Sequence, residues 1–275
     1  MKALKKILSF GALGVLLLIA AFDVWGFFGL GTLEPQQNPV LNENANKVVL
    51  VSGATGSVGD GLLKAAIEDP LVEKVHVITR RSSERIEEGV ASGKVEMHIL
   101  QDFTDYSSLS GILPEVNTVM WGLGTSSFNV DDATFTWIHV DFPVAFVTAW
   151  LAARNNGPMS FHYVTGMGTD PEGRQHWARE KGRAEQELAT LAQESDLRTF
   201  SYRSAFIRPT SEQSNVFHYL LEVLLRPGSL VITGKELGEA MLEISARTEE
   251  LANGTLIDNA DSIAYAKAYE KRDSE

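Results

Sequence analysis

The chain has 275 residues, of which 44% are hydrophobic and 22% charged, a composition typical of a folded protein with one large domain or two small ones. Acidic residues outnumber basic residues by 36 to 24, which argues against a general nucleic-acid binder, because phosphate backbones are held by clustered cations. The absence of cysteine excludes disulfides, thiolate metal sites and cysteine nucleophiles. The six histidines are scattered without a recognisable metal-ligand spacing, so no metal site is predicted.

Residues 1–33 differ in character from the rest of the chain. Lysines at positions 2, 5 and 6 precede the apolar run Ile7–Phe22, and Asp23 separates this run from a second apolar stretch, Val24–Leu33. A bilayer core requires about 20 apolar helical residues, which the two stretches provide together. We interpret residues 1–33 as a membrane anchor or, alternatively, as a signal segment that a peptidase removes.

A polar linker, residues 34–46, leads to an alternating pattern of strands and helices. Strands are predicted at 47–52, 75–79, 95–100, 118–121, 161–165 and 199–203, and helices at 60–68, 106–113, 132–155 and 176–194. This alternation predicts a parallel sheet, because a right-handed crossover between parallel strands requires a helix. We therefore expect residues 47–275 to form a Rossmann-like, doubly wound α/β domain, in which the part beyond residue 210 is a small, mostly helical region with a strand at 255–258.

A glycine-rich turn follows the first predicted strand. Glycines in Gly53-Ala54-Thr55-Gly56-Ser57-Val58-Gly59 permit a tight turn, a close approach of backbone to a pyrophosphate, and close helix–strand packing. The helix that begins there offers free N–H groups to phosphates. Because the turn follows a strand and opens a helix, it predicts a dinucleotide site formed by Gly53, Thr55, Gly56, Ser57, Val58 and Gly59.

The residues after the second predicted strand indicate which dinucleotide is bound. An NAD site usually has an acidic residue there, which binds the ribose 2′-hydroxyl. This chain has Arg80 and Arg81 instead, and guanidinium groups bind a 2′-phosphate bidentately, so NADP is the predicted cofactor. Asp102, which follows the third predicted strand, is placed to meet the adenine amino group, although aspartate at such a position is also a common cap.

These segments, together with the turn Gly122-Leu123-Gly124-Thr125, resemble the atypical short-chain dehydrogenases/reductases. Within that family the chain is similar to the Tat-interacting-protein-like oxidoreductases over residues 47–269. Lys181-Gly182-Arg183-Ala184-Glu185 resembles their K-G-x-x-E segment, and Tyr202-Arg203-Ser204-Ala205 stands where they have F-R-P-G. The resemblance implies a Rossmann-type fold, NADP binding that also involves Gly122, Leu123, Gly124 and Lys181, and redox chemistry on carbonyls or alcohols in active members.

The chain departs from this family at the proton donor. The resemblance implies a Tyr-x-x-x-Lys motif on one helix face, in which the phenol transfers a proton and the lysine lowers the phenol's pKa and binds the nicotinamide ribose. Here Trp177 replaces the tyrosine, while Lys181 is retained. An indole N–H donates a hydrogen bond but is not an acid or base near neutral pH. The predicted catalytic residues are Lys181 and Thr165, the one hydroxyl residue left where the family has a Ser-Ser pair.

The sequence leaves two functions open. The first is an NADP-dependent oxidoreductase of unusual mechanism, in which the unidentified small-molecule substrate or water supplies the proton. The second is a non-catalytic NADP(H)-binding sensor, regulator or assembly factor at a membrane, with a protein partner. The glycines, the arginines and Lys181 are sufficient for the second function, whereas the acid that the first requires is missing.

Two observations lead to opposite expectations about the side of the membrane on which the domain lies. Lysines before the apolar run, with Glu34 and Glu43 after it, favour a domain on the far side by the positive-inside rule. NADP binding instead favours access to the cytoplasmic cofactor pool. We expect a membrane-associated protein whose domain faces the cytoplasm, with export after signal cleavage as the alternative.

Overall fold

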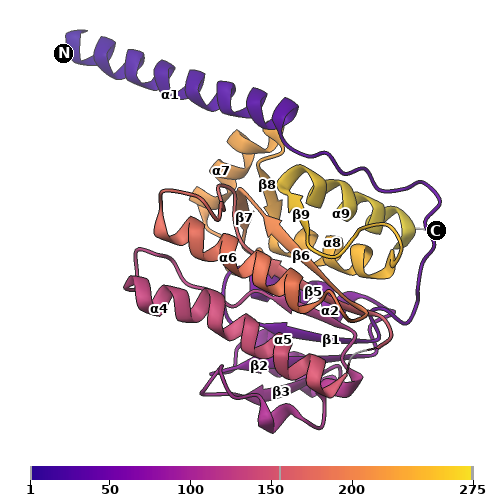
Figure 1. Ribbon diagram of the computed structural model, residues 1–275. Helices are drawn as coiled ribbons and strands as arrows, with labels where there is room; N and C mark the ends of the chain where they lie inside the picture. Colours follow the sequence, from indigo (N-terminus) through magenta and orange to yellow (C-terminus); the bar gives the residue numbers. More distant parts are fainter. Residues whose placement is uncertain (1, 155, 274–275) are drawn as a thin grey trace.

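A computed structural model describes residues 2–154 and 156–273 (Figure 1). Its central element is a seven-stranded sheet with the order β3-β2-β1-β4-β5-β6-β9, in which all neighbouring strands are parallel. The strands are β1 (Val48–Ser52), β2 (Lys74–Thr79), β3 (Val95–Ile99), β4 (Thr118–Trp121), β5 (Met159–Val164), β6 (Leu197–Arg203) and β9 (Thr255–Asp258). The strand order reverses between β1 and β4, which confirms the predicted doubly wound, Rossmann-like class.

Helices cover both faces of the sheet, so the core has two halves. One face is covered by α2 (Gly59–Glu68), α3 (Glu84–Ala91), α8 (Gly234–Ala246) and α9 (Asn259–Asp273), and the other by α4 (Asp132–Thr136), α5 (Phe142–Ala153) and α6 (His176–Leu191). Along β1, Val49 and Val51 join the first half of the core and Leu50 joins the second. Strands buried on both faces need apolar residues at successive positions, which explains the continuous apolar runs in the sequence.

The part beyond residue 210 is mostly helical, as expected, and its predicted strand at 255–258 is β9. Helices α8 and α9 pack on the main sheet and β9 extends it, while β7 (Phe206–Arg208) and β8 (Val231–Thr233) pair as a separate two-stranded sheet beside α7 (Val216–Leu225). The short strands β7 and β8 have too few residues to show a period in the sequence. Residues 106–113, predicted as a helix, instead contain the short 3₁₀ turn η1 (Ser107–Leu109), and a second one, η2 (Leu113–Glu115), begins at the last of them. Asn155, the predicted end of one helix, lies outside the described residues, as do residues 274–275.

Helix α1 (Lys2–Gly29) projects from the domain, and its C-terminal end rests on η4 (Arg226–Gly228) (Figure 1). The contact is close, since a Cβ atom on Gly26 would lie 2.4 Å from the Gly228 carbonyl oxygen. Among the described residues, one helical stretch, Asp132–Ala153, is long and apolar enough to span a membrane. However, 44% of its most apolar part is buried in the domain. The helical stretch Gly14–Gly26 is also apolar but is shorter. The predicted linker runs along the domain, where the Asn42 N–H donates to the Ala246 carbonyl (2.8 Å).

Helices α2 and α8 cross at glycines, which allows their backbones to touch. A Cβ atom on Gly61 would lie 2.4 Å from the carbonyl carbon of Gly234, and one on Gly238 would lie 2.6 Å from the Ala65 Cβ. Contacts of this length cannot be accommodated without moving one helix, because a backbone atom and a Cβ atom cannot turn aside as the end of a long side chain can.

We expect Gly61→Ala to lower the free energy of unfolding by about 1–3 kcal/mol or more, because the added methyl group overpacks the α2–α8 crossing. The matched control is Gly111→Ala, since Gly111 is exposed and a Cβ atom there would meet nothing within 4 Å. Urea denaturation of both variants measures the difference. Equal stability of the two variants would contradict the close crossing.

Candidate functional site

Two neighbouring cavities lie at the carboxyl ends of the central strands, where open α/β sheets bind their ligands. The loop cavity, about 420 Å³, is bounded by the glycine loop and the residues that follow β4, β5 and β6. The arginine cavity, about 390 Å³, is bounded by Arg80, the residues that follow β3, and helices α4 and α5. Both cavities share the segment Leu123-Gly124-Thr125, so together they form one elongated site.

The glycine loop is held against β4 by backbone contacts. Gly53 has a φ of +71°, and a Cβ atom on it would lie 2.6 Å from the carbonyl carbon of Gly122. A Cβ atom on Gly59 would lie 2.1 Å from the Gly53 carbonyl oxygen. These glycines therefore close the loop, whereas Gly56, Ser57 and Val58 line the loop cavity. Thr55 is not among the lining residues of either cavity.

The two arginines after β2 are both exposed. Neither guanidinium forms a hydrogen bond or an ion pair with the residues that the structure describes. Arg80 lines the arginine cavity, whereas Arg81 does not. A charged group without a protein partner at the mouth of a cavity is available to an anionic ligand.

Asp102 lies beside the arginine cavity without lining it. Its Oδ1 accepts hydrogen bonds from the Thr104 N–H (2.8 Å) and the Thr104 hydroxyl (2.6 Å), and these bonds hold the pKa of the exposed carboxyl below its usual value. These bonds form an Asx turn within the loop and do not cap a helix, which the sequence left as the alternative. The neighbours Gln101 and Phe103 line the cavity instead.

The first turn of α2 carries a buried acidic group that the sequence analysis did not single out. Asp60 is paired with Arg85 of α3 (2.8 and 3.2 Å) and accepts a hydrogen bond from the Thr210 hydroxyl (2.6 Å). Without a partner, the Asp60 carboxylate would repel an anion bound at the N-terminus of α2. Arg85 and Thr210 offset its charge, and no local sequence pattern connects these residues, which are far apart in the chain.

Lys181 and Thr165, the two predicted catalytic residues, both line the loop cavity. The Lys181 ammonium group donates a hydrogen bond to the Thr165 carbonyl oxygen. Burial lowers the pKa of Lys181 to about 8, while the nearby Glu185 carboxylate acts in the opposite direction. The Thr165 hydroxyl is already engaged, because it donates to the Tyr202 carbonyl oxygen (3.2 Å).

Trp177 lies in the first turn of α6, one helical turn before Lys181. Its indole N–H donates to the Gln175 side-chain oxygen, and its ring lies beside Gly168. Trp177 lines neither of the two cavities. The side chain that replaces the expected tyrosine is therefore turned to local contacts.

A π-helical turn, η3 (Trp137–Asp141), places His139 against the loop cavity. The His139 carbonyl oxygen has no α-helical donor, because the residue four positions later is Pro143, and it accepts from the Tyr163 hydroxyl instead (2.7 Å). The Nε2 atom of the His139 ring contacts the Thr125 backbone, and the Nδ1 atom has no hydrogen-bond partner among the described residues. Burial lowers the pKa of His139 to about 4. His139 is thus neutral near pH 7 and is not an acid there.

Ser204 is a further residue of the loop cavity whose role the sequence did not reveal. It is 5% exposed, it lines the cavity, and its hydroxyl has no hydrogen-bond partner among the described residues. A buried hydroxyl without a partner costs about 1–3 kcal/mol, so a polar ligand group at this position is favoured. The sequence signal was the replacement of the family's proline in F-R-P-G by Ser204.

The fold is that of the short-chain dehydrogenases/reductases, as comparison with solved structures shows. A 3-oxoacyl-[acyl-carrier protein] reductase from Brucella melitensis is similar with a TM-score of 0.61 and 17% identity, over 84% of this chain and 98% of that chain. The RhlG/NADP active-site complex from Pseudomonas aeruginosa gives a TM-score of 0.60 and 13% identity, over 79% of this chain and 96% of that chain. These likenesses confirm the resemblance at the level of the fold.

Similarity in sequence is partial. No family model matches the chain. The chain is 30% identical to the mitochondrial protein FMP52 of Chaetomium globosum over 122 residues, which cover 44% of this chain and 49% of FMP52. It is 36% identical to the hybrid PKS-NRPS synthetase xenE of Xenoacremonium sinensis over 62 residues, which cover 2% of that protein. The matches therefore span about half or less of these relatives.

Proposed function

We propose that this protein binds NADP(H) across the two cavities and acts as an oxidoreductase in which Lys181 is the acid. One observation carries the proposal: the glycine loop and Lys181 line one cavity, and the partner-free Arg80 lines the adjoining cavity. The fold accommodates either nicotinamide dinucleotide, since the Brucella melitensis reductase has been solved in complex with NAD and RhlG with NADP.

The residues present fit such a cofactor. Gly56 leaves the space at the N-terminus of α2 free of side chains, where N–H groups would hold the pyrophosphate. Arg80, with Arg81 beside it, would bind the 2′-phosphate, and Lys181 would bind the nicotinamide ribose. Gln101 and Phe103 surround the space on the adenine side. The nicotinamide ring, when bound, supplies hydride chemistry.

Lys181 is the best proton donor among the residues of the loop cavity. A lysine whose pKa is lowered to about 8 by burial remains largely protonated at pH 7 and gives up its proton readily. As hydride adds to a substrate carbonyl carbon, the carbonyl oxygen gains the electron pair and takes a proton from the ammonium group. The resulting neutral amine regains a proton from water. His139 and the Thr165 hydroxyl are less suited, because the first is neutral and the second is hydrogen-bonded.

Non-catalytic binding of NADP(H) is the second candidate function. It is favoured by Trp177, whose indole is neither an acid nor a base and lines neither cavity. In this case Lys181 would contribute only to cofactor binding. Tight NADPH binding without NADPH consumption against a panel of aldehydes and ketones would establish this function in place of the first.

We expect the purified protein to bind NADPH more tightly than NADH. The double variant Arg80→Ala/Arg81→Ala should weaken NADPH binding by on the order of 10- to 100-fold, because a charged contact contributes about 1.5–3 kcal/mol. NADH binding should change little and serves as the matched control. Fluorescence titration measures both affinities, and equal affinity of the native chain for the two cofactors would contradict the proposal.

Carbonyl reduction should decline as the pH rises through about 8, because the protonated form of Lys181 is the donor. Lys181→Arg keeps the positive charge but has no such titration, so it should retain NADPH binding while reduction falls by about 10²–10⁴-fold. An NMR titration of dimethylated lysines should show one resonance with a midpoint near 8, which is absent in Lys181→Arg. Undiminished reduction in this variant would rule out Lys181 as the acid.

We further propose that α1 holds the domain at a membrane, with the domain facing the cytoplasm. The described side chains of α1 include exposed apolar residues, among them Leu17, Leu18 and Phe28. Helix α7, which contacts α1, also exposes Val216, Phe217, Leu220 and Val223. Asp23 lies where α1 meets Gly228 of the domain, so its carboxylate need not enter the lipid.

The protein should remain in the membrane fraction through high-salt and carbonate washes, because insertion of apolar side chains is not screened by salt. In intact cells, external protease should leave the domain undigested, and opening the cells should expose it. Digestion from outside would contradict the cytoplasmic placement. A soluble mature protein that begins near Ala21 would contradict the anchor.

A further inference from the structure

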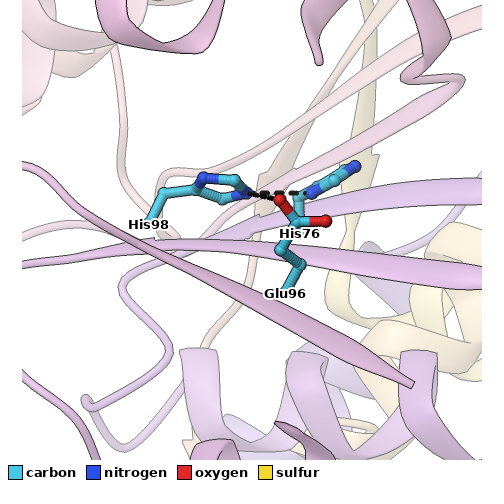
Figure 2. A group of neighbouring side chains, drawn as sticks. All are labelled: His76, Glu96 and His98. Atoms are coloured by element: carbon cyan, nitrogen blue, oxygen red, sulfur yellow. Dashed lines mark hydrogen bonds and ion pairs between the residues drawn. The ribbon is translucent and has the colours of Figure 1, made fainter. Parts of the chain in front are cut away.

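A cluster of potential metal ligands lies on the edge of the sheet, on the strands β2 and β3. The parallel register pairs His76 with Glu96 and Ile78 with His98, so the side chains of His76, Glu96 and His98 emerge on one face. Figure 2 shows the three side chains pointing toward one another. The His76 Nδ1 and His98 Nε2 atoms are 3.0 Å apart, and Glu96 Oε1 is 3.6 Å from His98 Nε2.

A second carboxylate fixes the proton on His76. The Nε2 atom of His76 is 2.9 Å from Glu115 Oε1, and an ionised carboxylate only accepts hydrogen bonds, so this nitrogen carries the proton. In the neutral ring the lone pair is then on Nδ1, which faces His98 and Glu96. A histidine whose second nitrogen donates to a carboxylate is the usual arrangement of a metal-binding histidine.

A lysine fixes the orientation of the Glu96 carboxylate. Lys74 contacts Glu96 Oε2 (2.8 Å), so the other carboxylate oxygen, Oε1, is the one that faces His98.

We propose that His76 Nδ1, His98 Nε2 and Glu96 Oε1 form a binding site for a divalent transition-metal ion such as Zn²⁺. The potential ligand atoms all lie within 4.8 Å of one another. Two nitrogens bound to a tetrahedral Zn²⁺ are about 3.3 Å apart. The His76 and His98 nitrogens, 3.0 Å apart, therefore need to move only slightly away from each other to make room for the ion. Two imidazoles and one carboxylate suit Zn²⁺, Co²⁺ or Ni²⁺ better than Mg²⁺ or Ca²⁺, which prefer oxygen ligands.

The site is open to solvent on one side and separate from the cofactor cleft. The side chains of His98 and Glu96 are 19% and 46% exposed, which gives an ion and a completing water access to the buried His76. None of the three residues lines the loop cavity or the arginine cavity. The bound ion would tie the edge strand β3 to β2, and the proposal does not depend on the proposed redox function.

Titration of the purified full-length chain with Co²⁺ alone tests the proposal. We expect one equivalent to bind with visible absorption bands, and Zn²⁺ to displace it. His98→Gln and Glu96→Gln, both on the exposed edge, should each weaken Co²⁺ binding by about tenfold or more. His218→Gln is the matched control, because it removes a histidine from α7, outside the cluster, and should leave binding unchanged.

A further variant tests the proposed role of Glu115. Glu115→Gln removes the carboxylate that orients His76 and should weaken Co²⁺ binding by about 10- to 100-fold without removing a ligand. Thermal melts without metal should show that each variant is folded. Absence of Co²⁺ binding at millimolar concentration, or equal binding by the native chain and His98→Gln, would overturn the proposal and leave the cluster as a hydrogen-bonded histidine pair.

Discussion

The elongated cleft formed by the loop cavity and the arginine cavity depends on a point where three segments of backbone touch without side chains between them. Gly53 lies against Gly122, and Gly59 lies against Gly53, at distances that no Cβ atom would permit. This contact brings the N-terminus of α2 next to the turn Leu123-Gly124-Thr125, which is the wall that the two cavities share. A larger side chain at Gly53 or Gly59 would separate the helix from β4 and divide the site. The elongated shape of the cleft therefore follows from the backbone.

Burial then determines the chemistry inside the cleft. The same desolvation that lowers the pKa of Lys181 to about 8 lowers that of His139 to about 4, so one group carries a mobile proton at neutral pH and the other does not. Glu185 limits the shift of Lys181 but is itself occupied by Arg203 (2.6 Å). The loop cavity thus combines one titratable cation with the uncommitted hydroxyl of Ser204.

Features that depend on local sequence patterns could be predicted from the sequence alone. The glycine loop and the main strands follow from periodicity and spacing along one or two elements, whereas Lys181 and Thr165 were singled out by the family resemblance. The packing of segments that are distant in the chain could not be predicted from such patterns. Gln101 and Phe103, rather than Asp102, line the arginine cavity, because the direction of a side chain after a strand depends on the turn that Thr104 completes.

Contacts between residues that are far apart in the chain could not be predicted from a single sequence either. Asp60 meets Arg85 and Thr210 only because the loop after β7 returns to α2. His76 and His98 have no motif spacing, yet the register of β2 and β3 places their ring nitrogens 3.0 Å apart. Similarly, β7 and β8 become strands only by pairing with each other.

The π-helical turn at Trp137–Asp141 controls the phase of the helices on either side of it. An α-helix rotates by about 100° per residue, so the extra residue held in the turn sets the faces of α4 and α5 out of step by that angle. Thr134 and Trp137 can therefore face the arginine cavity while Phe146 faces the sheet. The π-helical turn, whose His139 carbonyl accepts from Tyr163 in the core, thus affects which side chains form the wall of a cavity on the surface. In a variant that lost one residue here, the same sheet would carry a cleft with a different lining.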